Sequence, residues 1–270
     1  MNNIEKDYKE LNKKAWNNKV LTHMDSDFYD MKGFMKGKSS LNSIELELLG
    51  DVTGKSVLHL QCHFGQDSIS LSKMGAKVTG ADLSDIAIEE ARKIADKMNT
   101  DTSFVCSDIY DLPDNLSSEF DIVFTSYGTI GWLPDLDKWG KVVSHFLKPN
   151  ARFIIVDFHP FVWMYDNDFN KIEYSYFNRE AIVENETGTY ADRESEIEQT
   201  TVGWNHSTSE LINSLIKNNI QIESYTEYDY SPYNCFKGMV EYSPGKYRIE
   251  KFGDKLPLVY GLVGKKASNS

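Results

Sequence analysis

Cysteine is scarce in this sequence, and long hydrophobic runs are missing. The only cysteines among 270 residues are Cys62, Cys106 and Cys235, which stand far apart and form no Cys-x-x-Cys pair. This spacing argues against a disulfide framework or a structural zinc site and favours reduced thiols in a cytoplasmic protein. The longest apolar stretches, such as residues 153–156, fall well short of the ~20 residues that a membrane span needs. The charged N-terminal segment also lacks the apolar stretch typical of a secretory signal.

Positive charge is in short supply as well. The chain has 29 basic and 41 acidic residues, which gives a net charge of −12. Such a protein repels phosphate backbones, so the charge argues against a nucleic-acid partner and favours small-molecule chemistry. With 40% apolar residues, the chain is typical of a globular protein with one large domain, or one domain that carries a long insertion. Nothing in the composition fixes the oligomeric state.

From residue 56 onward, short apolar runs alternate with amphipathic segments. This alternation predicts a doubly wound α/β fold with a mostly parallel, seven-stranded sheet that is covered by helices on both faces. We expect the last strand to be antiparallel and to insert into the sheet. The predicted strands are 56–60, 77–82, 102–108, 120–127, 151–158, 220–230 and 256–266, and the predicted helices are 67–75, 84–98, 136–147 and 209–219.

Two segments fall outside this alternation. Residues 1–55 are polar and helical and end in a helix that stops at Gly50, so they predict an N-terminal cap on a domain that spans 56–270. Residues 160–206 carry ten acidic and three basic side chains with no helical period, and they predict a lid inserted after the fifth strand. Aromatic side chains of the two segments would form either an apolar box over the site or an accessory core. They are Trp16, Phe28, Tyr29, Trp163, Tyr190 and Trp204.

The turns that follow the predicted parallel strands are where ligands bind in such sheets. The first turn, 61–66, opens a helix, so its backbone N–H groups and the helix dipole can hold a polar or anionic group. This turn lacks the G-x-G-x-x-G spacing, because Gln61 and His63 stand where glycines would admit a pyrophosphate. The sequence therefore disfavours a dinucleotide at this site.

Carboxylates follow the next two strands. Asp82 at the end of the second strand could accept both hydroxyls of a ribose, or could instead cap the helix that starts near Ser84. Asp108 ends the third strand and precedes Ile109, an arrangement that suits an adenine amino group beside an apolar shelf. A solvated loop carboxylate is the alternative interpretation of Asp108.

Five segments in register carry a resemblance to a known family. They are VLHLQCHFGQD at 57–67, GADLSDIAIEEARK at 80–93, CSDIYDLP at 106–113, FDIVFTSYGTIGWLPD at 120–135 and FLKPNARFIIVDFHP at 146–160. In order and spacing they resemble the Rossmann-like (class I) S-adenosylmethionine-dependent methyltransferases. This resemblance implies the cofactor S-adenosyl-L-methionine.

The resemblance also implies roles for single positions. Asp82 would bind the ribose, Asp108 and Ile109 would hold the adenine, and Ser126 and Tyr127 would lie under the methionine moiety. The cofactor-binding residues that it implies are Gln61, His63, Gly65, Asp82, Leu83, Asp108, Ile109 and Ser126.

The first motif departs from the family pattern. The family usually has an acidic residue and two further glycines where this chain has His59, Gln61 and His63, whereas the glycine that would give the cofactor room is present as Gly65. His59 could organise the turn through hydrogen bonds, and the Gln61 carbonyl could accept from the cofactor ammonium. We expect no metal here, because His59 lies on a predicted strand and His63 in a turn.

The resemblance implies methyl transfer, and we expect a small-molecule acceptor under the aromatic cap. A general base is needed only if the acceptor must lose a proton. Candidates are His159, His206 and Tyr127, with His23 in the cap, although each of the histidines could instead be a structural hydrogen-bonding group. Two alternatives stay open: a methyltransferase that acts on a macromolecule such as tRNA or protein, and a non-catalytic module that has lost cofactor binding.

Overall fold

The apolar runs after residue 56 form one seven-stranded sheet with the order β3-β2-β1-β4-β5-β11-β8. The structure, a computed structural model, describes residues 3–268. The strands from β3 to β5 are parallel, and β11 is antiparallel to both of its neighbours, so the predicted fold class is confirmed. The strands of this sheet are β1 (Ser56–Leu60), β2 (Lys77–Asp82), β3 (Ser103–Cys106), β4 (Phe120–Ser126), β5 (Leu147–Phe158), β8 (Ile220–Tyr228) and β11 (Val259–Lys266).

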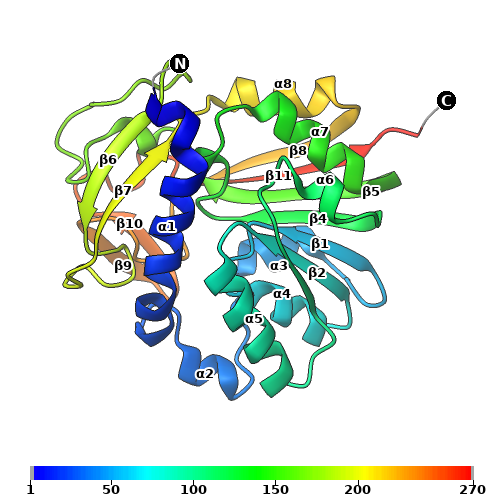
Figure 1. The fold of residues 1–270 in the computed structure, drawn as a ribbon. Coiled ribbons are helices and arrows are strands. Elements are labelled where there is room, and N and C mark those ends of the chain that lie inside the picture. Colours follow the sequence, from blue (N-terminus) through cyan, green and yellow to red (C-terminus); the bar gives the residue numbers. More distant parts are fainter. Residues whose placement is uncertain (1–2, 269–270) are drawn as a thin grey trace.

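Helices cover both faces of the sheet, as Figure 1 shows. Alternate strand residues face opposite layers, so Val57 and Ile122 pack on one side and Leu58 and Val123 on the other. One face carries α3 (Ser43–Leu49), α4 (Gln66–Lys73) and α5 (Asp85–Lys97), and the other carries α6 (Leu112–Asn115), α7 (Leu136–Phe146) and α8 (Thr208–Lys217).

Local chemistry at the helix ends accounts for most of the predicted boundaries. The Ser84 hydroxyl accepts from the N–H of Ala87 and starts α5, and the Ser207 hydroxyl accepts from the N–H of Glu210 and starts α8. Gly50 follows α3 with φ +63°, a conformation that suits glycine. The helices therefore begin and end within one or two residues of the predicted positions.

The topology brings the carboxyl ends of the parallel strands to one edge of the sheet. The strand order reverses at β1, which lies between β2 and β4. The chain leaves β1, β2, β3, β4 and β5 at this edge, so the turns that follow them are neighbours. β11 pairs with β5 along its length, from Val259 opposite Phe158 to Lys265 opposite Arg152, as expected for a last strand that inserts into the sheet.

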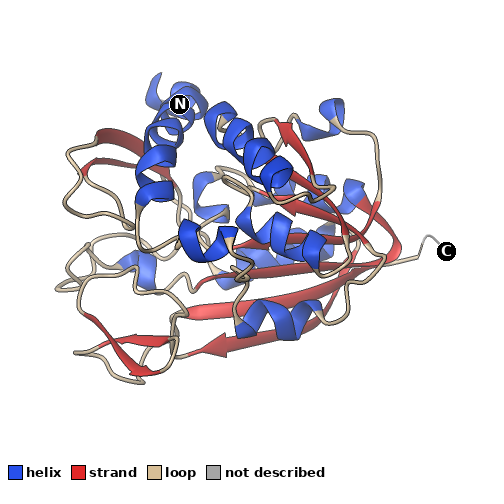
Figure 2. Ribbon diagram, turned by 90° about the horizontal axis from the view of Figure 1, so that it is seen from below, coloured by secondary structure: helices blue, strands red, loops and turns tan. Residues whose placement is uncertain are grey.

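The cap and the lid lie beyond this edge (Figures 1 and 2). Of the helices in the predicted cap 1–55, α1 (Asn3–Asp25) and α2 (Met31–Met35) lie there, whereas α3 belongs to the layer on one face of the sheet. The segment 160–206 contains a short 3₁₀ turn, η2 (Val162–Met164), and a hairpin of β6 (Ile182–Thr187) and β7 (Glu198–Gly203). A second 3₁₀ turn, η1 (Ile130–Trp132), follows β4 and lies outside this segment. The absence of a helical period in this segment thus reflects an antiparallel pair whose β6 residues alternate between half-buried and exposed.

The structure also contains a second hairpin, which, like the first, the sequence pattern did not predict. β9 (Met239–Ser243) and β10 (Lys246–Ile249) lie within residues 231–255, which the pattern left as a long connection. Met239 and Ile249 of this hairpin pack against Val162 and Phe169 of the inserted segment. The lid therefore consists of two segments, 160–206 and 231–258, which share one small apolar core.

Asn12 joins the cap to the lid. Its side-chain Nδ2 donates to the carbonyl of Val202 at 2.8 Å, and its Oδ1 accepts from the N–H of Val202 at 2.9 Å. The amide of a helix residue thus completes both backbone hydrogen bonds of a residue on β7. Because Asn12 is buried, this pair fixes α1 against the hairpin.

No helix within residues 3–268 combines the length and the apolar character needed to cross a membrane.

The first turn of the sheet yields a prediction on stability. Gly65 has φ +80°, and a Cβ at this position would lie 2.6 Å from Cε1 of Phe104, whereas Gly54 has φ +72° with nothing within 4 Å. We expect Gly54→Ala to cost about 1–2 kcal/mol of unfolding free energy for the left-handed backbone. Gly65→Ala should cost about 1–3 kcal/mol more, because the added methyl overpacks the core.

Urea unfolding at equilibrium measures both variants against the wild type. Equal losses for the two substitutions would show that contact with Phe104 does not determine the need for glycine at position 65.

Candidate functional site

A cavity of about 930 Å³ lies where the turns of the sheet meet the cap and the lid. Its wall contains residues from the turns after β1, β2, β3 and β4, which the topology brings to one edge. The structure thus brings together every residue that the family resemblance implies for the cofactor. Those on the wall are Gln61, His63, Gly65, Asp82, Leu83, Asp108, Ile109 and Ser126.

The turn after β1 keeps a glycine-like backbone without its glycines. Gln61 has φ +55° and His63 has φ +50°, which places both in the left-handed region. For a residue with a side chain this conformation costs roughly 1–2 kcal/mol, so surrounding contacts must hold it. The N–H of His63 donates to Oδ2 of Asp82 at 2.8 Å, which is one such contact.

The side chains of this turn are engaged with neighbouring elements. Nε2 of Gln61 donates to the carbonyl of Thr129 at 2.8 Å and so connects the turns after β1 and β4. Nε2 of His63 lies 3.0 Å from Nδ1 of His23 on α1. Oε1 of Gln61 and Nδ1 of His63 are buried without a hydrogen-bond partner among the described residues. Both residues line the cavity, so each brings one unpaired polar atom to its wall region.

Asp82 has a defined role in the turn and spare acceptor capacity. Its Oδ2 accepts from the N–H of His63 and its Oδ1 from the N–H of Ser84, each at 2.8 Å. Ser84, and not Asp82, supplies the side chain that caps α5. Burial raises the pKa of Asp82, and the backbone N–H groups oppose this shift because they stabilise the charged form. Each oxygen keeps a lone pair with which to accept one more hydrogen bond.

Asp108 is paired with the cap. Its Oδ1 lies 2.8 Å from Nζ of Lys9 on α1 and accepts from the N–H of Tyr110 at 2.9 Å. The side chain of Asp108 is one tenth exposed, so the alternative of a freely solvated carboxylate is wrong. Lys9 thereby fixes the first half of α1 over the end of β3.

Gly65 is required by the protein itself. Its positive φ and the close approach of Phe104 both demand glycine at this position. The expected reason for this glycine, room for the cofactor, is thus secondary to core packing, although Gly65 does line the cavity.

Asp157 is a site residue that the sequence pattern did not single out. It ends the apolar run of β5 and lines the cavity, and its carboxylate accepts from the N–H groups of Gly128, Thr129 and Phe158 and from the Thr129 hydroxyl. Burial raises the pKa of Asp157, and these donors oppose the shift. A lone carboxylate within a buried strand was the signal for such a role.

Tyr127 lines the cavity at the end of β4 with φ +45°. Its hydroxyl donates to Oε2 of Glu45 on α3 at 2.9 Å. Oε1 of Glu45 accepts from the amide of Asn42 at 3.1 Å, and that same amide donates to the hydroxyl of Tyr233 at 2.8 Å. A buried network thus joins two tyrosines of the cavity wall to one carboxylate.

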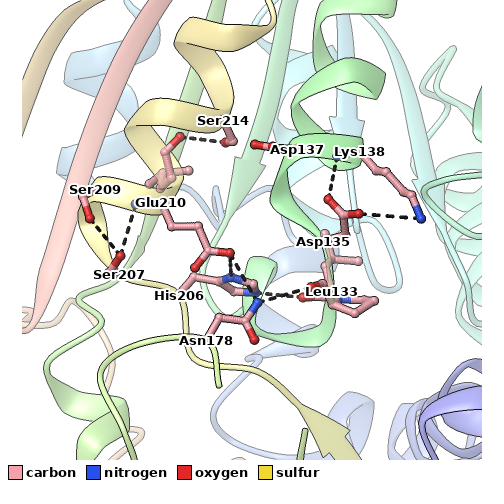
Figure 3. A network of polar contacts seen from close by, with 12 residues as sticks. Leu133, Asp135, Asp137, Lys138, Asn178, His206, Ser207, Ser209, Glu210 and Ser214 are labelled. Atoms are coloured by element: carbon pink, nitrogen blue, oxygen red, sulfur yellow. Dashed lines mark hydrogen bonds and ion pairs between the residues drawn. The ribbon is translucent and has the colours of Figure 1, made fainter. Parts of the chain in front are cut away.

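The two histidines expected as bases are held by the protein. Nδ1 of His159 accepts from the N–H of Phe161, its Nε2 lies 2.8 Å from Glu227, and the residue does not line the cavity. His206 does line it, but its side chain is only 1% exposed. Nε2 of His206 donates to the carbonyl of Leu133, and Nδ1 lies 3.0 Å from Glu210 (Figure 3).

Two further histidines form a buried cluster with the aromatic cap. Burial lowers the pKa of His23 to about 3 and that of His63 well below its usual range, and the Lys19 ammonium adds to both shifts. The ring of Tyr29 stacks on His23. The cluster is therefore neutral at physiological pH. No three His, Cys, Asp or Glu side chains among residues 7–268 are placed to hold a metal ion.

Aromatic rings form much of the rest of the wall. Tyr233 and Phe236 of the second lid segment add to the rings that the sequence predicted, and they were missed because residues 231–255 had no assigned place. All the aromatic residues expected over the site do line the cavity. They are Trp16, Phe28, Tyr29, Trp163, Tyr190 and Trp204.

Known proteins resemble this chain in sequence and in fold. Residues 57–150 match the family described as a methyltransferase domain. The ubiquinone biosynthesis O-methyltransferase of Coxiella burnetii is 30% identical over 129 residues, which cover 47% of this chain and 54% of that protein. An uncharacterized methyltransferase of Synechocystis is 33% identical over 132 residues, or 48% of this chain and 59% of that protein. The chain thus spans about half the length of the curated relatives it matches.

Solved structures share the fold over almost the whole chain. An S-adenosylmethionine-dependent methyltransferase from Clostridium acetobutylicum has a TM-score of 0.57 at 18% identity and covers 95% of this chain and 99% of its own. The geranyl diphosphate C-methyltransferase of Streptomyces coelicolor has a TM-score of 0.60 at 14% identity, with 96% and 98% covered. Residues 57–150 thus carry a methyltransferase domain, and the strand order and these structures show that the chain has the fold of the class I S-adenosylmethionine-dependent methyltransferases.

Proposed function

We propose that this protein transfers the methyl group of S-adenosylmethionine to a small-molecule acceptor. One observation carries the proposal: a single cavity of about 930 Å³ joins the expected cofactor residues to the aromatic rings of the cap and of both lid segments. A cavity of this size is within the range of small-molecule sites and leaves room for more than one ligand.

The free acceptor atoms around the first turn fit the cofactor. Asp82 would accept the ribose hydroxyls with the lone pairs that its two backbone donors leave open. Asp108 is contacted through Oδ1, so its other oxygen would accept from the adenine amino group beside Ile109. The unpartnered Oε1 of Gln61 is buried at this turn and would accept from the cofactor ammonium.

The chain supports the reaction by position and by exclusion of water. When bound, S-adenosylmethionine would supply an electrophilic methyl group on its sulfonium. Holding an acceptor in line with that group can contribute several kcal/mol through effective molarity. The aromatic rings of the cap and lid exclude water from the reacting atoms and favour a cation at their faces.

Tyr127 is the proposed route for a proton that leaves the acceptor. Tyr127 lines the cavity, so its phenol oxygen could take up the proton of a hydroxyl group on the methyl acceptor while the phenol's own proton passes to Oε2 of Glu45, 2.9 Å away. In this relay the acceptor loses one proton, Tyr127 stays a neutral phenol and Glu45 becomes the acid. His159 lies outside the cavity, and the side chain of His206 is buried with its Nε2 bonded to the carbonyl of Leu133, which favours Tyr127 over either histidine.

A small acceptor is favoured over a macromolecule by the charges around the cavity. The basic side chains on the described wall are Lys19 and Lys38, and Lys38 pairs with Asp30. Glu184 and Glu186 of the lid hairpin lie on the same wall. Such a surface does not attract a nucleic-acid backbone. Two similar proteins also support a small acceptor, since one is named for ubiquinone biosynthesis and the other for geranyl diphosphate.

A non-catalytic module is disfavoured by the open cavity. Side chains at positions 61 and 63 would abolish cofactor binding only if they filled the cleft, yet both side chains bond to neighbouring elements and a cavity remains.

Asp82→Ala tests the cofactor half of the proposal. We expect the affinity for S-adenosylhomocysteine to fall by about 5- to 150-fold, which corresponds to ~1–3 kcal/mol for lost hydrogen bonds to a charged group. Isothermal titration measures this change. Asp85→Ala is the matched control, because Asp85 pairs with Lys13 and Asn17 and does not line the cavity.

Two results would contradict the proposal. A wild-type protein that fails to bind S-adenosylhomocysteine would overturn the function itself. A folded Asp82→Ala variant with unchanged affinity would remove the ribose role from this carboxylate.

Glu45→Gln tests whether the proton acceptor of the relay titrates near neutrality. Burial raises the pKa of Glu45 from 4.5 to about 7, and the nearby Asp67 carboxylate adds to the rise. A raised pKa means that the folded state holds the proton more tightly. The stability that this proton gives is complete below pH 4.5 and is lost as the pH rises to about 7.

We therefore expect the unfolding free energy of the wild type, relative to Glu45→Gln, to fall by up to about 3 kcal/mol between pH 4.5 and pH 8. Urea titrations of both proteins across this range measure the difference, in which the other titrating groups cancel. A difference that stays constant with pH would show that Glu45 is ionised throughout and that its proton affinity is ordinary.

A further inference from the structure

Lys19 is a buried cation on the wall of the cavity. It lies on α1, its residue is only 3% exposed, and it belongs to the cavity lining. Lysine is seldom buried to this extent unless its ammonium is paired, because desolvation of the charge costs several kcal/mol.

Its ammonium has no anionic partner in the protein. Among the side chains of residues 7–268 no carboxylate lies within 4.0 Å of Nζ, and Nζ donates no hydrogen bond to these residues. The other lysines that reach this part of the molecule differ in this respect, since Lys9 pairs with Asp108 and Lys38 with Asp30.

Two indole rings hold the ammonium in place. Nζ lies 4.9 Å from the ring centroid of Trp16 and 5.7 Å from that of Trp132, and both rings line the cavity. Cation–π contacts of this kind position a charge but replace only part of its hydration. Glu186 and Glu184 lie farther away and favour the charged form, whereas burial lowers the pKa of Lys19.

We propose that Lys19 is the anion-recognition residue of this cavity and that it receives a carboxylate group of a bound small molecule. The proposal rests on the proposed function for its setting and deepens it, because it assigns a chemical class to a ligand. A carboxylate would form a charge-assisted hydrogen bond with an ammonium that the fold leaves unpaired.

Two ligands could carry this carboxylate. One is the acceptor, which we favour because the Lys19 ammonium lies beside Trp132 and is affected by the charges of the lid hairpin, whereas a different lysine, Lys9, pairs with Asp108 of the expected adenine site. The other is the methionine moiety of the cofactor. Both sources share one chemistry, and two arms of a single experiment separate them.

The experiment compares wild type, Lys19→Met and Lys19→Arg. In the acceptor arm, the protein is saturated with S-adenosylhomocysteine and titrated with benzoate and with benzyl alcohol, which suit aromatic walls and differ in charge. In the cofactor arm, the affinity for S-adenosylhomocysteine is divided by that for 5′-methylthioadenosine, which lacks the amino-acid carboxylate.

For an acceptor carboxylate, we expect wild type to bind benzoate at least about 10-fold more tightly than benzyl alcohol, as a charge-assisted hydrogen bond allows. Lys19→Met should abolish this preference, and Lys19→Arg should retain it. Neither variant should change the ratio of the affinities for S-adenosylhomocysteine and 5′-methylthioadenosine. For a cofactor carboxylate, Lys19→Met should instead lower the cofactor ratio by a similar factor.

The proposal is overturned if both the benzoate preference and the cofactor ratio are the same in wild type and in a folded Lys19→Met variant. Thermal unfolding of the free proteins checks folding, and a buried unpaired charge predicts that Lys19→Met is no less stable than wild type. The proposed function is tested separately by the binding of 5′-methylthioadenosine to wild type. If wild type does not bind this compound, the cofactor site is contradicted and not the role of Lys19.

Discussion

Two buried carboxylates at the ends of strands hold the backbone from which this site is built. Asp82 accepts the N–H of His63 and so retains the turn after β1 in a conformation that glycine would adopt at lower cost. Asp157 accepts N–H groups of Gly128 and Thr129 and fixes the turn after β4. Burial of these carboxylates is tolerated because backbone donors surround them. The floor of the cavity depends on both, and Gln61 joins the two turns to each other.

The fold could be predicted from the sequence because its signals are local. Unbroken apolar runs indicated the parallel strands, and Ser84 and Gly50 marked helix ends through their own hydrogen bonds and backbone freedom. The two lid hairpins were missed for a physical reason. Their strands are only four to six residues long, and the core that joins Val162 to Met239 depends on contacts between segments far apart in the sequence.

The candidate site divides in the same way. Positions that follow strands could be predicted, since the topology alone brings Asp82, Asp108 and Ser126 to one edge. The use of each side chain could not. His159 points to Glu227 on β8 instead of the cavity, and Lys19 lines the cavity although nothing in the sequence of α1 sets it apart from the other lysines of this helix. Such orientations depend on packing between elements, which no periodicity records.

The position of β11 sets the order in which this molecule can be completed during synthesis. β11 is the last strand, yet it lies between β5 and β8 in the interior of the sheet. Until β11 has emerged from the ribosome, β5 presents an open edge and β8 has no neighbour to pair with. Both lid segments precede β11, so they leave the ribosome before the strand that anchors them. A nascent chain therefore carries every residue of the cavity wall for some time before it can close that cavity around a ligand.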